Sequence, residues 1–160
     1  MTMVIRIQRE DFDAASEVAI LTRGRTDIGA VVTFTGICRG GPGDDIAAMT
    51  LEHYPGMAET EIARHVEEAR GRWQLTGVTV VHRYGRLIPG DNIVLVVTAA
   101  KHRGEAFAAA EFLMDYLKTS APFWKQEERG DRMSWVGAKE SDAAAAARWS
   151  QRPSKREAAE

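Results

Sequence analysis

The stretch NIVLVVTAAKHRGEAFAAAEFLMDYLKTSAPFWKQEE, residues 92–128, decides the fold class of this chain. Its opening, NIVLVVTAA, is rich in apolar and β-branched residues and predicts a strand. A helix is predicted over about 104–119, and Pro122 prevents it from continuing. The expected buried stripe of that helix is Phe107, Ala110, Met114 and Leu117. A strand over 124–128 follows, so strands and helices alternate, as in an α/β or α+β domain.

The chain before this stretch continues the alternation. The predicted elements are a strand around 4–7, a helix over about 11–23, a strand from about 27 to 39, a strand over 49–54, a helix over 57–73 and a strand over 78–85. Gly24 is expected to end the first helix, and Gly36 indicates a bulge or a close backbone approach. After the strand that ends at Arg39, GGPGDD at 40–45 is predicted to be a mobile loop, and RLIPGD at 86–91 is predicted to be a turn.

The C-terminal part adds two short strands and a helix. Strands are predicted over 124–128 and 132–137, joined by a turn at Gly130 and Asp131. A final helix at 141–149 is expected to be capped by Ser141 or Asp142. Because no linker or repeat divides the sequence, residues 1–150 are expected to form one domain, with 151–160 as a solvated tail.

Composition limits the function classes. The 160 residues include 44% hydrophobic and 28% charged residues, which is normal for a soluble globular protein. A formal net charge of −2 gives no indication of nucleic-acid binding, so any anion site must be local. The single cysteine excludes an internal disulfide and favours a reducing compartment, and no signal peptide or membrane span is expected, so a cytoplasmic location is predicted. No metal site or cofactor is expected, since the histidines lack ligand spacing.

Cationic side chains at the ends of predicted elements are the candidate site residues. Arg39 follows a strand, and His102 and Arg103 lie between a strand and the N-terminus of a helix, where anions bind readily. Lys118 lies in the last turn of that helix, and Lys125 follows the break. These positions predict a pocket for an anionic ligand, without an evident general base.

Each candidate also has an ordinary structural explanation. Arg39 could end a solvated strand, and His102 and Arg103 could be simple loop residues. Lys118 could offset the negative end of the helix dipole, while Lys125 could lay its alkyl stem along aromatic surface. The lone Cys38 is expected to be a small buried residue rather than a nucleophile.

A family resemblance adds to this interpretation. The motifs TFTGICR, LEHYPGMAE, HRYGRLIPGD, AAKHRGEAF and FLMDYLKTSAPFWKQE, in this order, resemble the large, catalytic subunit of molybdopterin synthase, the MoaE family. The resemblance covers about residues 3–149. It implies an α+β fold of the α/β hammerhead type with an additional antiparallel β subdomain. It also implies a homodimer that binds two copies of a small ubiquitin-like sulfur-carrier subunit, forming a heterotetramer.

The same resemblance implies a reaction and a set of site residues. The family converts cyclic pyranopterin monophosphate, precursor Z, into molybdopterin, using sulfur that arrives as a thiocarboxylate on the carrier's C-terminal glycine. Lys118 and Lys125 match the catalytic positions. The substrate-binding positions match Ile37, Cys38, Arg39, His102, Arg103, Lys118, Lys125, Gln126 and Glu127. The chain departs from the family after Arg39, where GGPGDD replaces a segment that usually contains Asn and His.

Two other functions compete with a sulfur-transferring enzyme. A binding module would accept a partner's C-terminal tail and use the lysines only to pair with its carboxylate. A nucleic-acid-binding protein would need a basic face, and the sequence shows none. The joint presence of Lys118 and Lys125 favours the enzyme.

Overall fold

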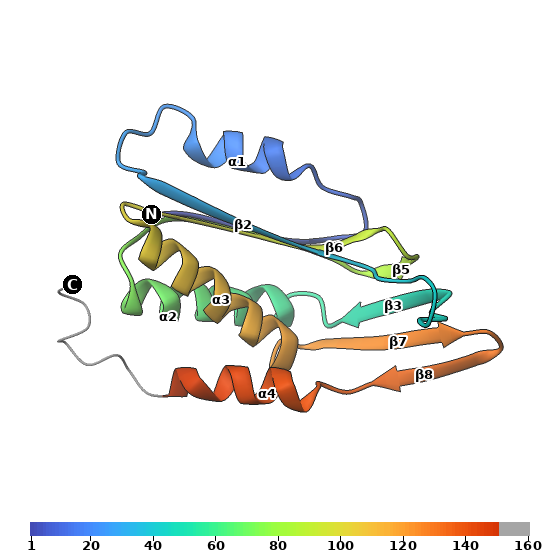
Figure 1. Cartoon of the computed structure of the whole chain (residues 1–160). Helices are drawn as coiled ribbons and strands as arrows, with labels where there is room; N and C mark the ends of the chain where they lie inside the picture. Colours follow the sequence, from blue (N-terminus) through green and yellow to red (C-terminus); the bar gives the residue numbers. More distant parts are fainter. Residues whose placement is uncertain (151–160) are drawn as a thin grey trace.

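The computed structural model describes residues 1–150, and the tail predicted at 151–160 lies outside the described residues. Two four-stranded sheets form the framework (Figure 1). The first has the order β1-β4-β6-β2, with bounds Thr2–Gln8 (β1), Leu75–Arg83 (β4), Asn92–Ala100 (β6) and Ala30–Ile37 (β2). The second has the order β5-β3-β7-β8, with bounds Gly85–Leu87 (β5), Ala48–His53 (β3), Phe123–Arg129 (β7) and Arg132–Val136 (β8).

The pairing of the strands confirms the expected mixed α+β class. Only β1 and β4 run parallel, and the second sheet is antiparallel throughout. This second sheet is the additional antiparallel subdomain that the sequence resemblance implied. Its strand β5 was missed, because three residues with a glycine at φ 93° next to a Pro-Gly turn carry no strand pattern.

Helices cover both faces of the first sheet. Met57–Arg72 (α2) and Arg103–Thr119 (α3) lie on one face, and Ala14–Thr22 (α1) lies on the other (Figure 1). Successive strand residues point to opposite faces. Val78 and Val80 of β4 therefore pack with the core beneath α2 and α3, while Val81 packs with Leu21 of α1.

Helix α3 runs across the sheet with a face of small residues, which corrects one prediction. Phe107 is 61% exposed and does not belong to the buried stripe. The buried face begins one residue earlier, at Ala106 and Ala109, since alanines let the helix axis approach the sheet. Thr98 on β6 donates a hydrogen bond to the Ala106 carbonyl oxygen at 2.7 Å, which confirms this close approach.

Several element ends differ from the predicted bounds. Strand β2 ends at Ile37, two residues before Arg39, and its register shifts after Gly36. The bulge predicted at Gly36 is thus confirmed, and a Cβ added there would lie 2.8 Å from Val94 Cγ1. At the start of α1, Asp13 is the N-cap and accepts a hydrogen bond from the Ala15 amide.

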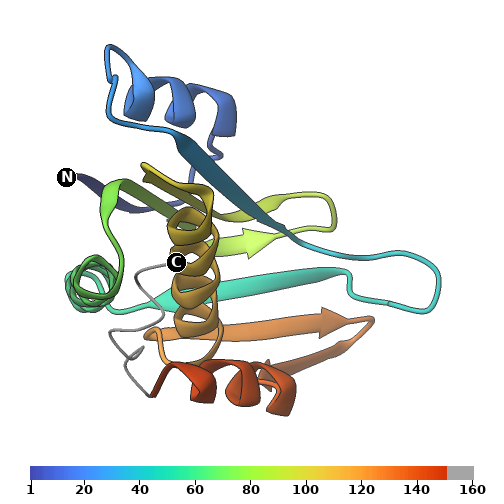
Figure 2. The same ribbon diagram turned by 60° about the vertical axis from the view of Figure 1, so that its left-hand side comes forward.

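The last described helix is Glu140–Ala147 (α4), followed by a 3-10 turn at Arg148–Ser150 (η1). The cap predicted at Ser141 or Asp142 is wrong, because Lys139 occupies the N-cap position and makes no side-chain capping bond. Figure 2 shows α4 lying along the end of α3 and beside the second sheet. This placement brings the segment that leads into α4 close to the end of α3.

Candidate active site

A cavity of about 380 Å³ lies where the two sheets, the end of α3 and the start of α4 meet. The strands supply its apolar walls, and the ends of the helices supply charged groups. Its lining comprises Phe34, Gly36, Ile37, Met49, Leu51, His82, Ile93, Val94, Met114, Leu117, Lys118, Thr119, Ala121, Phe123, Lys125, Val136, Gly137, Ala138, Lys139, Ser141 and Asp142.

The two lysines that flank the helix break both line this cavity. Lys118 lies in the last turn of α3 and Lys125 on β7, and the chain reverses between them through Ser120 and Pro122. The pKa of Lys118 is lowered, first by burial of its ammonium group and then by the charge of Lys125. The residue as a whole is still exposed, so this desolvation is partial. The turn therefore places two like charges at one cavity, where they can bind an anion.

A third lysine and a carboxylate complete the charged wall. Lys139 and Asp142, before and within the first turn of α4, line the same cavity. Both act on Lys118, since Asp142 raises its pKa and Lys139 lowers it. Sequence reasoning missed both residues, because the Lys139–Asp142 segment lacks any local motif and reaches the cavity only through the packing of α4 on α3.

The floor of the cavity holds a buried histidine that sequence reasoning also set aside. His82 on β4 is 6% exposed and stacks on Phe123, with ring centroids 4.0 Å apart. Its pKa is lowered to about 4, mainly by burial; the hydrogen bond to the Arg83 carbonyl oxygen opposes this shift, and the charges of Lys118 and His53 add to it. The available signal was a polar side chain inside the apolar run VTVVH of a predicted central strand.

A chain of ion pairs connects Arg39 to Lys125. Asp44 lies 3.4 Å from both Arg39 Nε and Arg129 Nη1, measured to its carboxylate oxygens. Arg129 in turn contacts Glu127 at 3.1 Å, and Glu127 lies 3.6 Å from Lys125 Nζ. These contacts hold the GGPGDD loop against β7, and they place carboxylates beside cations that an anionic ligand would also use.

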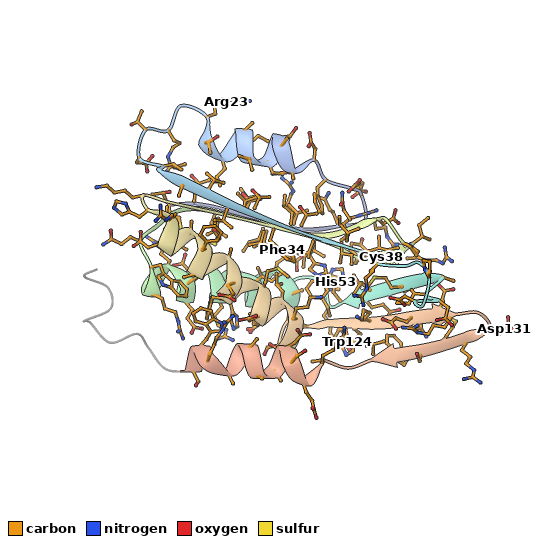
Figure 3. The ribbon with its side chains drawn as sticks, in the orientation of Figure 1. Arg23, Phe34, Cys38, His53, Trp124 and Asp131 are labelled. Carbon is orange, nitrogen blue, oxygen red and sulfur yellow. The ribbon has the colours of Figure 1, made fainter. Side chains whose placement is uncertain are left out.

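The remaining predicted residues of β2 and β7 differ in whether they line the cavity. Ile37 lines the cavity and is 55% exposed. Cys38 is buried among Met49, Leu51 and Leu87, beyond the end of β2 (Figure 3), and burial raises the pKa of its thiol. Because a raised pKa leaves little thiolate, the structural interpretation of Cys38 is favoured. Gln126 lies between Lys125 and Glu127 on β7, so its side chain faces the other side of the sheet.

His102 and Arg103 lie at the opposite end of α3 from Lys118. His102 is the N-cap residue and Arg103 the first residue of the helix, and both are exposed. With 1.5 Å of rise per residue, about 22 Å of helix separates Arg103 from Lys118. Within one chain, the structure therefore does not bring these two residues to the cavity.

The chemistry of the cavity is that of an anion site. In the part of the chain that the structure describes, no cluster of three or more His, Cys, Asp or Glu side chains could hold a metal ion. Over the same residues, no helix is long and apolar enough to cross a membrane. The lysines provide hydrogen-bond donors and positive charge, and partial burial strengthens the interaction of Lys118 with an anion.

Comparisons with known proteins place this geometry in a family. The family model described as MoaE protein matches residues 7–120. The molybdopterin synthase catalytic subunit of Mesorhizobium japonicum is 60% identical over 147 residues, covering 91% of this chain and 92% of that protein. Its counterpart in Escherichia coli is 56% identical over 126 residues, covering 78% and 84%.

Solved structures agree with the sequence relatives. The molybdopterin biosynthesis MoaE protein from Burkholderia ambifaria superposes with a TM-score of 0.79 at 52% identity, covering 93% of this chain and 98% of that one. Molybdopterin synthase from Staphylococcus aureus superposes with a TM-score of 0.75 at 30% identity, covering 82% and 95%.

Proposed function

This chain belongs to the MoaE protein family, and from that membership we propose that it is the catalytic subunit of a molybdopterin synthase. In this role it transfers sulfur from the thiocarboxylated C-terminus of a small carrier subunit to precursor Z, forming the dithiolene of molybdopterin. Relatives that carry the name of this catalytic subunit cover nine-tenths of the chain, which supports an enzymatic function for the whole described domain.

The observation that carries the proposal is the position of Lys118 and Lys125 in one cavity. Precursor Z carries a phosphate and the carrier tail carries a thiocarboxylate, so both reactants are anions that repel each other. Two ammonium groups on the walls of one cavity offset this repulsion as the sulfur attacks. Lys118, whose pKa is lowered first by burial, acts at the reacting carbon, and Lys125 orients the substrate.

Arg39, Glu127 and the GGPGDD loop do not line the cavity, but their ion pairs lead to Lys125 at its wall. The ion pair between Arg39 and Asp44 is exposed on the arginine side, with 80% of that side chain accessible. A substrate phosphate can therefore displace Asp44 from Arg39 at little cost. Glu127 supports Lys125 from the same strand through an ion pair of 3.6 Å.

A homodimer accounts for the position of His102 and Arg103. These residues match substrate-binding positions of the family, yet they lie about 22 Å along α3 from Lys118 in the same chain. We infer that they serve the cavity of the second protomer, so that each site of the dimer takes residues from both chains. Two carriers on this dimer give a heterotetramer, and the single cysteine is compatible with a cytoplasmic location.

A single-turnover assay with purified components tests the function. The chain is mixed with thiocarboxylated carrier and precursor Z, and the dithiolene product is measured with time. Product formation is expected with the wild-type chain. Tight binding of the carrier without any product would instead support the binding-module alternative, in which the lysines only hold the carrier's tail.

A further inference from the structure

The cavity floor contains a histidine that two neighbouring strands and a stacked ring hold in place. His82 belongs to β4, the second strand of the first sheet, and pairs with Ile7 of β1 and Val94 of β6. It shares the face of Val78 and Val80, the face that α2 and α3 cover. Its ring stacks on Phe123 at an interplanar angle of 16°. The two paired strands and the stacked ring therefore restrict how the imidazole can lie.

The hydrogen bond of His82 determines its tautomer. Nδ1 lies 2.8 Å from the carbonyl oxygen of Arg83, which can only accept a hydrogen bond, so Nδ1 carries the proton. In the neutral ring, Nε2 is then a lone-pair acceptor. Among the described residues, Nε2 has no hydrogen-bond partner, and it is not among the fully enclosed side-chain atoms that lack one. Since His82 lines the cavity, the cavity is the space that Nε2 can reach.

The charges around His82 favour the neutral ring. Lys118 from α3 and His53 from β3 act on it from two directions, and each disfavours a proton on Nε2. Asp142 lines the cavity but does not figure among the groups that affect His82. The ring therefore remains an uncharged acceptor throughout the neutral pH range.

This acceptor differs from the other polar groups of the cavity. Lys118, Lys125 and Lys139 offer only donors, which suits phosphate and thiocarboxylate oxygens. A nitrogen heterocycle also presents N–H and O–H donors, and the lysines cannot receive them. We propose that His82 Nε2 accepts a hydrogen bond from an N–H or O–H donor of the bound substrate, which makes His82 a substrate-binding residue of the cavity floor. This inference rests on the proposed function, since precursor Z supplies both the anion and the donor.

The experiment combines one direct and one functional measurement. Imidazole nitrogen NMR of the wild-type chain, with and without saturating precursor Z, reports on His82 Nε2 itself. Expected results are a protonated Nδ1 and an unprotonated Nε2 in the free chain, and a shift of the Nε2 signal when precursor Z binds. In parallel, precursor Z binding and single-turnover rates are measured for His82→Phe and for the control His53→Phe.

The control variant separates the acceptor from the aromatic contact. His53 lies in the same row of rings, 6.1 Å from Phe123 and 4.6 Å from Tyr84, but it does not line the cavity. His82→Phe keeps an aromatic ring over Phe123 and removes the acceptor, so precursor Z binding should weaken about tenfold or more, while carrier binding is retained. His53→Phe should change precursor Z binding less than about twofold, because it leaves the cavity intact.

The possible outcomes distinguish this inference from the proposed function. If precursor Z binds and the Nε2 signal does not move, or if His82→Phe binds it as tightly as His53→Phe, the role of His82 is overturned and the function stands. If the wild-type chain does not bind precursor Z at all, both are overturned. Should His82→Phe not fold, the NMR measurement on the wild-type chain decides alone.

Discussion

At the scale of single residues, the position of Lys118 fits two roles, and substitutions of Lys118 and of Arg70 distinguish them. As the basic residue in the last turn of α3 it stabilises the helix dipole, and as a wall of the cavity it meets the reacting groups. Arg70 in the last turn of α2 has the first role without the second. The two residues are therefore alike in their place at a helix end, although Arg70 also forms an exposed ion pair with Glu67.

We expect Lys118→Ala to lower single-turnover dithiolene formation at least about a hundredfold, the scale on which a positioned catalytic group acts. Its free energy of unfolding should change by about 1 kcal/mol or less. Arg70→Ala should have a similar small effect on stability and leave the rate unchanged. A rate for Lys118→Ala near that of the wild type would return Lys118 to the role of a helix-dipole partner.

His82 gives the stability of the fold a predictable pH dependence. Its pKa is about 4 in the folded chain and close to 6.5 when unfolded, so between these values the unfolded chain binds the extra proton. Stability contributed by the neutral ring is thus complete above pH 6.5 and decreases as the pH falls toward 4, by about 3 kcal/mol in total.

Urea unfolding of the wild type and of His82→Phe at pH 7 and pH 4.5 measures this effect. The wild type should lose about 2 to 3 kcal/mol more stability between the two values than the variant does. His65, whose pKa burial also lowers, is present in both and cancels in the difference. Parallel losses in the two proteins would show that His82 is not the group that titrates.

Sequence reasoning could find some of these residues and not others, for a physical reason. Lys118 and Lys125 lie on either side of a helix break that local rules identify, so their convergence could be predicted. His82 is one residue of a central strand. Its side chain lies at the floor of the cavity only because that strand is buried in the folded chain, and no local pattern predicts this. Lys139 reaches the cavity through a tertiary contact that leaves no local pattern.

At the scale of elements, a carboxylate of α3 binds two side chains of the C-terminal segment. Asp115 accepts a hydrogen bond from Trp149 Nε1 at 2.6 Å and pairs with Arg148 at 2.9 Å. The Trp149 ring packs edge-on against Trp73 and Phe112. These contacts anchor the segment that carries Lys139 and Asp142 to the cavity.

Replacing Asp115 by Ala should therefore affect both stability and substrate binding. Trp149 would lose its acceptor in a partly buried position, at a cost of about 1 to 3 kcal/mol in the free energy of unfolding. Precursor Z binding should weaken as well, because the wall formed by Lys139 is released. In the control Glu111→Ala, only an exposed ion pair with Arg148 is lost, which costs below about 1 kcal/mol. Precursor Z binding is measured by calorimetry and the free energy of unfolding by denaturation. If Asp115→Ala and Glu111→Ala changed both quantities equally, Asp115 would not be the residue that anchors the C-terminal segment.

Element positions were predictable where the pattern was local. The strand β6, the helix α3 and the β7–β8 hairpin follow from hydrophobic period and turn residues, and the structure confirms them. The predicted buried face of α3 was wrong at Phe107. The close fit of alanines against the sheet outweighed the preference for burying a large side chain. Strand β5 was missed because it forms only by pairing with β3, which lies far away in the sequence.

At the scale of the whole molecule, the separation between Arg103 and Lys118 requires an explanation. The alternation of strands and helices predicted an α/β or α+β domain, and the family resemblance specified α+β, but no property of one chain predicts which residues meet across a dimer. If Arg103 serves the second protomer's cavity, each active site is composite, and the two chains of a dimer must each contribute one part.

Mixed dimers test this arrangement without a structure of the complex. Lys118→Ala and Arg103→Ala each remove one part of every site, so each homodimer should be nearly inactive. In a heterodimer of the two, one cavity combines both substitutions, whereas the other combines the intact Lys118 of one chain with the intact Arg103 of its partner. Random reassociation of equal amounts should therefore restore about a quarter of the wild-type sites, because half of the dimers are mixed and each has one intact cavity. The measurement is single-turnover dithiolene formation after the two variants are dissociated and reassociated together, with separately treated variants as the control. Were Arg103 to act on the cavity of its own chain, neither cavity of the mixed dimer would be complete, and activity would stay at the level of the separate variants.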